Sequence, residues 1–101
     1  MRHRRVELGT VVAERKYDWQ RGRNAGTLTV RIGAPQRDSR PGFDWVCPVQ
    51  FLGAPRGFGL MTAVRPIYGV DQLQALTLAL RFVEITLGHV APALNLTVGL
   101  E

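Results

Sequence analysis

The sequence predicts an α+β domain, a mainly antiparallel four-stranded meander with one apolar helix packed on one face and a short C-terminal strand, in the order ββββαβ. Hydrophobic residues recur at every second position in much of the first two thirds of the chain, which is the period of a strand. After Tyr68 the period changes to about 3.6 residues, the period of a helix. Alternation returns over residues 94–100. These three observations fix the expected order of the elements.

Four stretches before Tyr68 read as strands. They cover residues 11–19, 27–32, 44–51 and 58–67. The second alternates strictly, so Leu28, Val30 and Ile32 are expected to face the core. The segments between the first three stretches, residues 20–26 and 33–42, contain glycine, proline and polar side chains. They predict a hairpin loop and a long mobile connection.

The third stretch contains a proline at an informative position. Trp45, Cys47, Val49 and Phe51 share one face, which we expect to be buried. Pro48 lies between them and cannot donate a hydrogen bond to a neighbouring strand. The third strand is therefore expected at an edge of the sheet or at a bulge.

The helix is expected over residues 72–87. Asp71 is a favourable N-cap, and Gln74 three residues later completes the pattern of a capping box. Gly88 is the expected stop, with Pro92 just beyond it.

The predicted helix is apolar around most of its circumference. On a helical wheel the apolar arc is roughly 240° wide, whereas a helix lying on one sheet needs little more than 100°. One stripe contains Leu73, Leu76, Leu80, Val83 and Leu87, and a second contains Ala75, Leu78, Phe82 and Ile85. The sheet can cover only one side of such a helix.

Three alternatives remain for what covers the side of the helix that the sheet does not reach. The C-terminal tail and the long loop of the same chain could fold over the helix, a second copy could cover it in a homodimer, or a different partner could bind there. We expect the protein interface on the second stripe, at Leu78, Phe82 and Ile85.

The composition indicates one globular domain over residues 1–101, with 46% hydrophobic and 21% charged residues. Residues 1–5 form a basic N-terminus that is expected to be disordered, and residues 93–101 are expected to hold the C-terminal strand. Cys47 is the single cysteine, so an internal disulfide is excluded, and no secretory signal pattern is present. Because Arg81 and Glu84 fall inside the apolar helix, we expect no membrane span. The expected compartment is the cytoplasm.

Arginine dominates the positive charge. The net charge is +5, and of the 13 basic residues only Lys16 is a lysine. This bias reflects either the coding background or a surface that meets nucleic acid or an acidic partner. The candidate contacts are Arg2, Arg4, Arg5, Arg21, Arg23, Arg37 and Arg40.

The sequence predicts no catalytic or cofactor site. The candidate soft metal ligands, His3, Cys47 and His89, are far apart in the sequence and lack the spacing of a structural zinc site. Cys47 falls on an expected core face, where a thiol is inert. The glycines near residues 53–59 lack the GK[ST] of a phosphate-binding loop. We therefore expect no metal, no cofactor and no enzymatic activity.

A family resemblance rests on four motifs. They are Val12-Ala13-Glu14-Arg15, Val30-Arg31-Ile32-Gly33, Asp44-Trp45-Val46-Cys47-Pro48, and the segment from Tyr68-Gly69-Val70-Asp71 through Leu80. Together they make the stretch from Val11 to about Leu87 resemble a family of small bacterial proteins known only as a domain of unknown function. The resemblance implies a shared fold and brings no activity with it.

The function that follows from these observations is non-enzymatic. We expect a protein-interaction protein of the inhibitor, immunity or accessory type, which docks its surface on a macromolecular partner and is a candidate homodimer. The alternative is a nucleic-acid-binding module that uses the arginine-rich loops.

Overall fold

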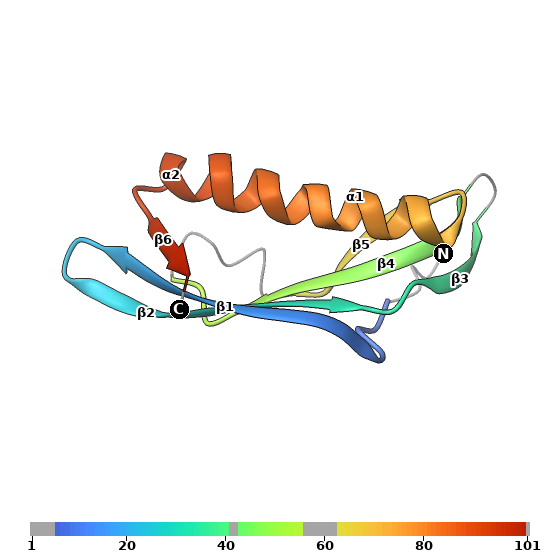
Figure 1. Ribbon diagram of the computed structural model, residues 1–101, viewed down its shortest axis with the longest axis horizontal. Helices are drawn as coiled ribbons and strands as arrows, with labels where there is room; N and C mark the ends of the chain where they lie inside the picture. Colours follow the sequence, from blue (N-terminus) through green and yellow to red (C-terminus); the bar gives the residue numbers. More distant parts are fainter. Residues whose placement is uncertain (1–5, 41–42, 56–62, 101) are drawn as a thin grey trace, which may run out of the picture.

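One antiparallel sheet with a helical segment lying lengthwise on one face forms the α+β fold that the sequence predicts (Figure 1). The computed structural model describes residues 6–40, 43–55 and 63–100. The strands are β1 (Val11–Arg21), β2 (Asn24–Gly33), β3 (Gln36–Arg40), β4 (Phe43–Leu52), β5 (Arg65–Gly69) and β6 (Thr97–Leu100). The helical segment comprises α1 (Gln72–Ile85), the π-helical turn η2 (Thr86–Val90) and α2 (Ala91–Ala93). The expected disordered segment, residues 1–5, lies outside the described residues.

Strand β4 is in the interior of the sheet. Val49 pairs with Ile32 of β2 and also with Arg65 of β5, so β2 and β5 lie on opposite sides of β4. Val46 likewise pairs with β3 and with β5, which means that β3 continues the line of β2 along the same side. Strand β1 pairs with β2, and β6 pairs with the second half of β1. The expected C-terminal strand is thus present, at the edge of the sheet next to β1.

The prolines explain how β4 can be interior. Pro48 stands opposite Pro66 of β5, and because neither residue has an N–H, this pair needs no hydrogen bond from either. On the other side, residues 33–35 stand against residues 47–48, so the chain bulges by one residue there. Of the two expectations for Pro48, the bulge is confirmed and the sheet edge is wrong.

Two segments that we expected to be loops are strands. Strands β1 and β2 reach Arg21 and Asn24, and only Gly22 and Arg23 remain as the turn, with Gly22 at φ +60°. A two-residue turn with positive φ matches the right-handed twist of a hairpin, so the polar tip stays paired. Residues 36–40 form β3, where pairing with β4 satisfies the backbone of a segment whose side chains are polar.

The last strand before the helix lies later in the chain than expected. We predicted residues 58–67, whereas β5 covers Arg65–Gly69. Residues 58–62 of that prediction lie outside the described residues. Gly69 then allows β5 to meet the helix closely, because a Cβ atom there would lie 2.5 Å from the backbone nitrogen of Ala75.

The core follows the predicted alternation of β2 and β4. Leu28, Val30 and Ile32 are buried under the helix, as expected. Cys47, Val49 and Phe51 lie beside them on the same face of β4 and are also buried, and Trp45 packs against the edge of this cluster.

The helix begins as predicted. The side chain of Asp71 accepts a hydrogen bond from the backbone N–H of Gln74 at 2.7 Å. The side chain of Gln74 in turn accepts from the backbone N–H of Val70 at 2.8 Å, so the reciprocal bond falls one residue before the N-cap. Both bonds satisfy backbone donors at the start of α1.

The helix does not end at Gly88, which corrects our prediction. The π turn absorbs this residue and the helix continues to Ala93. The stop is Asn95, whose φ of +58° is left-handed. Its N–H donates to the carbonyl of Pro92, and the N–H of Leu96 donates to that of Ala91, which is a Schellman motif.

By length and composition, residues Gln72–Ala93 would suffice to cross a membrane. They are the one helical stretch of this kind among the described residues, and the core helix of a soluble domain can meet the same criteria. One side of this segment lies on the sheet (Figure 1).

Candidate interaction surface

Helix α1 contacts the sheet through its smallest apolar residues. Ala75 and Ala79 are fully buried. Phe82 lies on the same line and meets the ring of Phe51 edge-on, with 6.1 Å between ring centroids. Thr86 completes the line, buried, with its hydroxyl donating to the carbonyl of Phe82 at 2.8 Å. These side chains define the face of the helix that the sheet covers.

The leucines of the first predicted stripe point away from the face of the helix that the sheet covers. Leu73 is 73% exposed and Leu80 is 48% exposed. The neighbouring members of the stripe are partly buried against the margin of the core. We call this surface the leucine flank, and it consists of Leu73, Leu76, Leu80, Val83 and Leu87.

The predicted interface residues do not form one exposed surface. Phe82 faces the sheet, as described above. Leu78 is half-buried, and Ile85, which is 49% exposed, lies on the side of the helix opposite the leucine flank. The surplus of apolar surface on α1 is thus divided, with Leu73 and Leu80 exposed on the first stripe and Ile85 on the second, and the interface stays a prediction.

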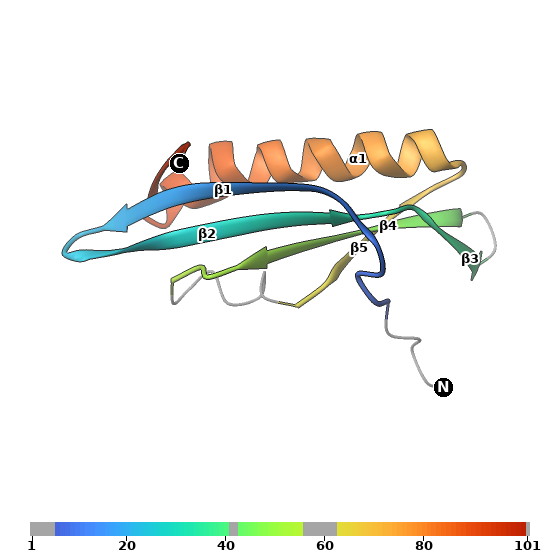
Figure 2. The ribbon, with the colours of Figure 1, turned by 60° about the horizontal axis from the view of Figure 1, so that its bottom comes forward.

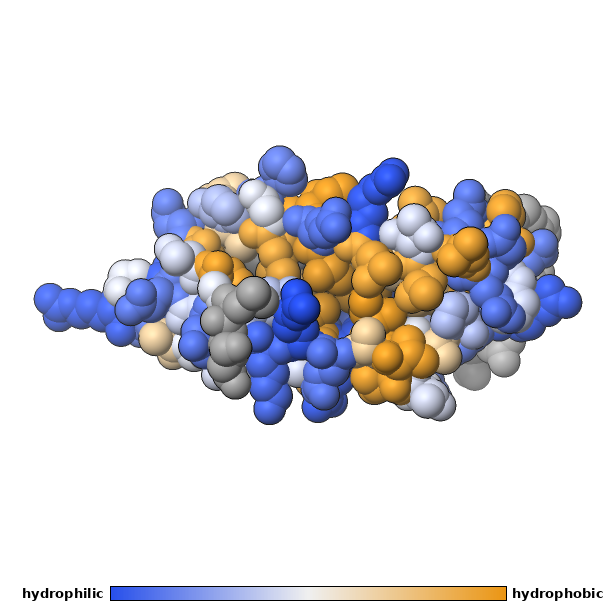
Figure 3. Space-filling view, viewed as in Figure 1, coloured by the Kyte–Doolittle hydropathy of each residue, from blue (hydrophilic) through white to orange (hydrophobic). Residues whose placement is uncertain are grey.

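The leucine flank looks toward the β1 side of the molecule. Figures 1 and 2 show α1 lengthwise over the sheet, with β1 along one side and β5 on the other. On a right-handed helix that runs in this direction, the residues about a quarter turn beyond the sheet-facing line point to β1. Figure 3, seen from that side, shows hydrophobic residues gathered over α1 and the space below it.

Neither of the expected covers from the same chain lies over this flank in the part of the chain that the structure describes. The C-terminal tail pairs with β1 at the sheet edge, and the segment after Gly33 pairs with β4 as β3. β6 reaches only residues Tyr17 to Gln20 of β1. The first half of β1, from Val11 to Lys16, thus has β2 on one side and no described strand on the other.

The described arginine candidates fall at opposite ends of the molecule. Arg21 and Arg23 are at the tip of the β1–β2 hairpin, while Arg37 lies in β3 at the far end of the sheet (Figure 1). Arg37 stacks on Trp45, with 5.2 Å from its guanidinium carbon to the ring centroid. Arg40 is also in β3, and Arg2, Arg4 and Arg5 lie outside the described residues. Nucleic-acid binding stays a prediction, and the hairpin tip and Arg37 lie too far apart along the sheet to form one patch.

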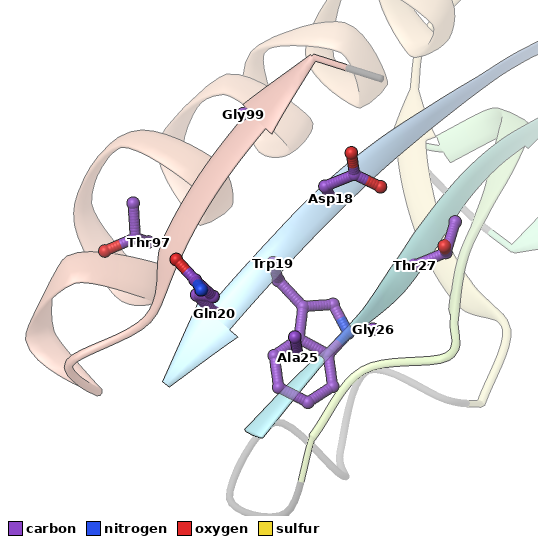
Figure 4. Close-up of a pocket in the computed structure, with 8 residues that line it drawn as sticks. All are labelled: Asp18, Trp19, Gln20, Ala25, Gly26, Thr27, Thr97 and Gly99. Atoms are coloured by element: carbon purple, nitrogen blue, oxygen red, sulfur yellow. The ribbon is translucent and has the colours of Figure 1, made fainter. Parts of the chain in front are cut away.

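One concavity opens beside the hairpin. It has a volume of about 590 Å³ and is lined by residues of β2, β1 and β6 (Figure 4). The carboxylate of Asp18 and the hydroxyls of Thr27 and Thr97 line it. The Trp19 indole N–H donates to the carbonyl of Gly53 at 2.9 Å, so this ring ties β1 to the turn after β4. Because Asp18 and both threonines are exposed, the concavity lacks the desolvation that an acid–base site requires.

Cys47 is placed in the core as predicted. Its thiol donates to the carbonyl of Gly33 at a donor–acceptor distance of 3.4 Å, and burial raises its pKa from the ordinary value of 9.0 to about 11. A thiol with a raised pKa is a poor nucleophile. No cluster of three potential metal ligands occurs among the described residues.

Comparison with known proteins gives a family without an activity. The family model of DUF6968, a domain of unknown function, matches residues 13–94. No curated protein and no solved structure matches the chain.

Proposed function

We propose that this chain, which belongs to the DUF6968 family of domains of unknown function, is a non-enzymatic protein-interaction module that docks another protein surface on its leucine flank. An inhibitor, an immunity protein or an accessory subunit would act in this way. The module needs no cofactor for such a role.

The observation that supports the proposal is the exposure of Leu73 and Leu80 on a helix whose sheet-facing side is already buried. Scattered single leucines on a surface are ordinary, but a row on one helix, bordered by partly buried apolar neighbours, is typical of an interaction site. Fully burying one such side chain is worth roughly 1.5–3 kcal/mol. A partner that covers the row therefore gains most of its binding energy there.

A photo-crosslinking amino acid placed at position 80 tests the proposal in the cells that make the protein. We expect one discrete covalent adduct whose second component is a protein, identified by mass spectrometry. Thr77 is the matched control position, because it is also exposed but lies on the polar side of the same helix. Equal adduct formation at both positions, or no protein adduct at position 80, would refute docking on the leucine flank.

A further inference from the structure

A second feature on the same side of the molecule, the edge of β1, indicates which partner binds the leucine flank. We propose that the leucine flank is occupied by a second copy of this chain, and that the two copies join through the open first half of β1. This inference rests on the proposed function and deepens it. It commits to one occupant, one symmetry and one strand register.

The open half of β1 is a template for strand pairing. Residues Val11 to Lys16 are all exposed. Strand β2 pairs with Val11 and with Ala13 to Lys16 on one side, where a bulge leaves Val12 outside the ladder, and no described strand pairs with them on the other side. An unpaired strand edge presents free N–H and C=O groups that another strand can satisfy. Antiparallel pairing of this edge with its own copy is compatible with a two-fold axis, the commonest symmetry of soluble oligomers.

Two-fold symmetry restricts the register. The axis passes midway between two directly opposed residues, so one residue of the strand must face its own copy. Registers centred on Glu14 or Arg15 place like charges opposite each other, which destabilises a sheet. A register centred on Val12 is short, because Gly9 has a φ of +64° and leaves the extended conformation.

A register centred on Ala13 avoids both problems. It places Glu14 opposite Val12 of the second copy, at the bulge of β1, so no two like charges are opposed. The pairing then stops before Tyr17, where the pairing of β1 with β6 begins.

The same axis brings the two leucine flanks together. Ala13 stands opposite Ile32 in the β1–β2 ladder, and directly opposed residues share a face of the sheet, so Ala13 points to the side on which α1 lies. Its methyl group leaves room at the centre of the joined strands, and Arg15 of each copy lies on the same face to either side of it. Leu80 and its neighbours from both copies face each other across that space, on the side of α1 that Figure 3 shows. The apolar row and the strand edge, which have no common explanation in the single chain, become parts of one interface.

The first test is the mass of the purified full chain in solution, measured by light scattering and by sedimentation over a range of micromolar concentrations. We expect a dimer that dissociates when Leu80 is replaced by Glu. A monomer at every concentration overturns the inference. The proposed function would then still stand or fall on whether position 80 forms an adduct with a different protein in cells.

A matched pair of substitutions tests the register without disturbing the fold, because Val12 is 54% exposed. Val12→Lys brings a positive charge opposite Glu14 of the second copy, and Val12→Glu brings a negative one. Counting both symmetric contacts, we expect the glutamate variant to dissociate about tenfold more readily than the lysine variant. Equal dissociation constants overturn the register.

Cysteine substitution tests the same point by geometry. Directly opposed Cβ atoms are about 4.5–5.5 Å apart, so an Ala13→Cys variant should form an intermolecular disulfide on oxidation. Arg15→Cys is the control, because it lies on the same face but about 13 Å from its own copy along the strands in this register. The Cys47 thiol is buried and forms no disulfide in either variant. Cross-linking at position 15 rather than 13 overturns the proposal.

Discussion

Single residues carry the clearest physical assignments in this protein. Cys47 is completely buried and donates its S–H to a backbone carbonyl, which identifies it as a core side chain. Burial disfavours the thiolate, and the raised pKa follows from that desolvation. A raised pKa in the folded state has a measurable consequence for stability.

Stability should fall at high pH because of Cys47. Between about pH 9 and about pH 11 the unfolded chain loses the thiol proton while the folded chain retains it, so the free energy of unfolding decreases as the pH rises through this range. The loss is on the order of 2 kcal/mol and is absent below about pH 9. Urea unfolding of the wild type and of Cys47→Ala across this range measures it. Parallel pH profiles for the two proteins would contradict the prediction.

At the scale of elements, a strand could be predicted from the sequence where one of its faces is hydrophobic and the other is polar. β2 and β4 carry hydrophobic residues on their buried face, and their existence and core residues were predicted correctly. β3 has the sequence Gln-Arg-Asp-Ser-Arg, without an apolar residue, so it could not be told from a loop. Its pairing with β4, the next strand along the chain, makes it a strand.

The orientation of α1 could not be predicted because its apolar arc has no clear boundary. Hydrophobicity favours burying leucine, but the close approach of the helix to Gly69 favours a small side chain at Ala75, and Ala79 is buried on the same face. Close packing at these points decided the orientation. The helix stop had a weak signal, since asparagine tolerates the left-handed conformation found at Asn95 but glycine at position 88 is the commoner choice.

Substitutions on the two faces of α1 should differ strongly in cost. Phe82→Ala removes a ring that packs on Phe51, and we expect a loss of about 2–3 kcal/mol in the free energy of unfolding. Leu73→Ala should change it by less than about 0.5 kcal/mol, because Leu73 is exposed. Urea unfolding extrapolated to low protein concentration compares the two without a contribution from association. A larger loss for Leu73→Ala would reverse our assignment of the helix faces.

At the scale of the whole molecule, the charge is distributed over the length of the sheet while the apolar surface is gathered along one side. The described arginine candidates are at the two ends, and the leucine flank lies between them over β1 (Figures 1 and 3). The sequence predicted the excess of apolar surface and the net charge of +5, but not their separation in space, which depends on how the strands pair.

Salt should affect self-association and nucleic-acid binding in opposite directions. Two copies, each with a net charge of +5, repel one another, and salt screens this repulsion. We therefore expect the dimer to persist or tighten between about 0.05 M and about 0.5 M NaCl. Binding driven by phosphate contacts would weaken steeply over the same range. Sedimentation of the chain alone and titration with a DNA duplex distinguish the two. Dissociation of the dimer by salt would count against an apolar interface.

The π turn sets a limit on the leucine flank of the helical segment. Leu73, Leu80 and Leu87 follow one another at intervals of seven residues, and Leu94 would be the next in the series. The extra residue in the π turn rotates the later residues by about 100°, so Leu94 instead packs against the core. The heptad series of leucines therefore has three members and ends at Leu87. An extended element packed along the series loses contact with one leucine when it shifts by seven residues, so the series favours one alignment over all shifted ones.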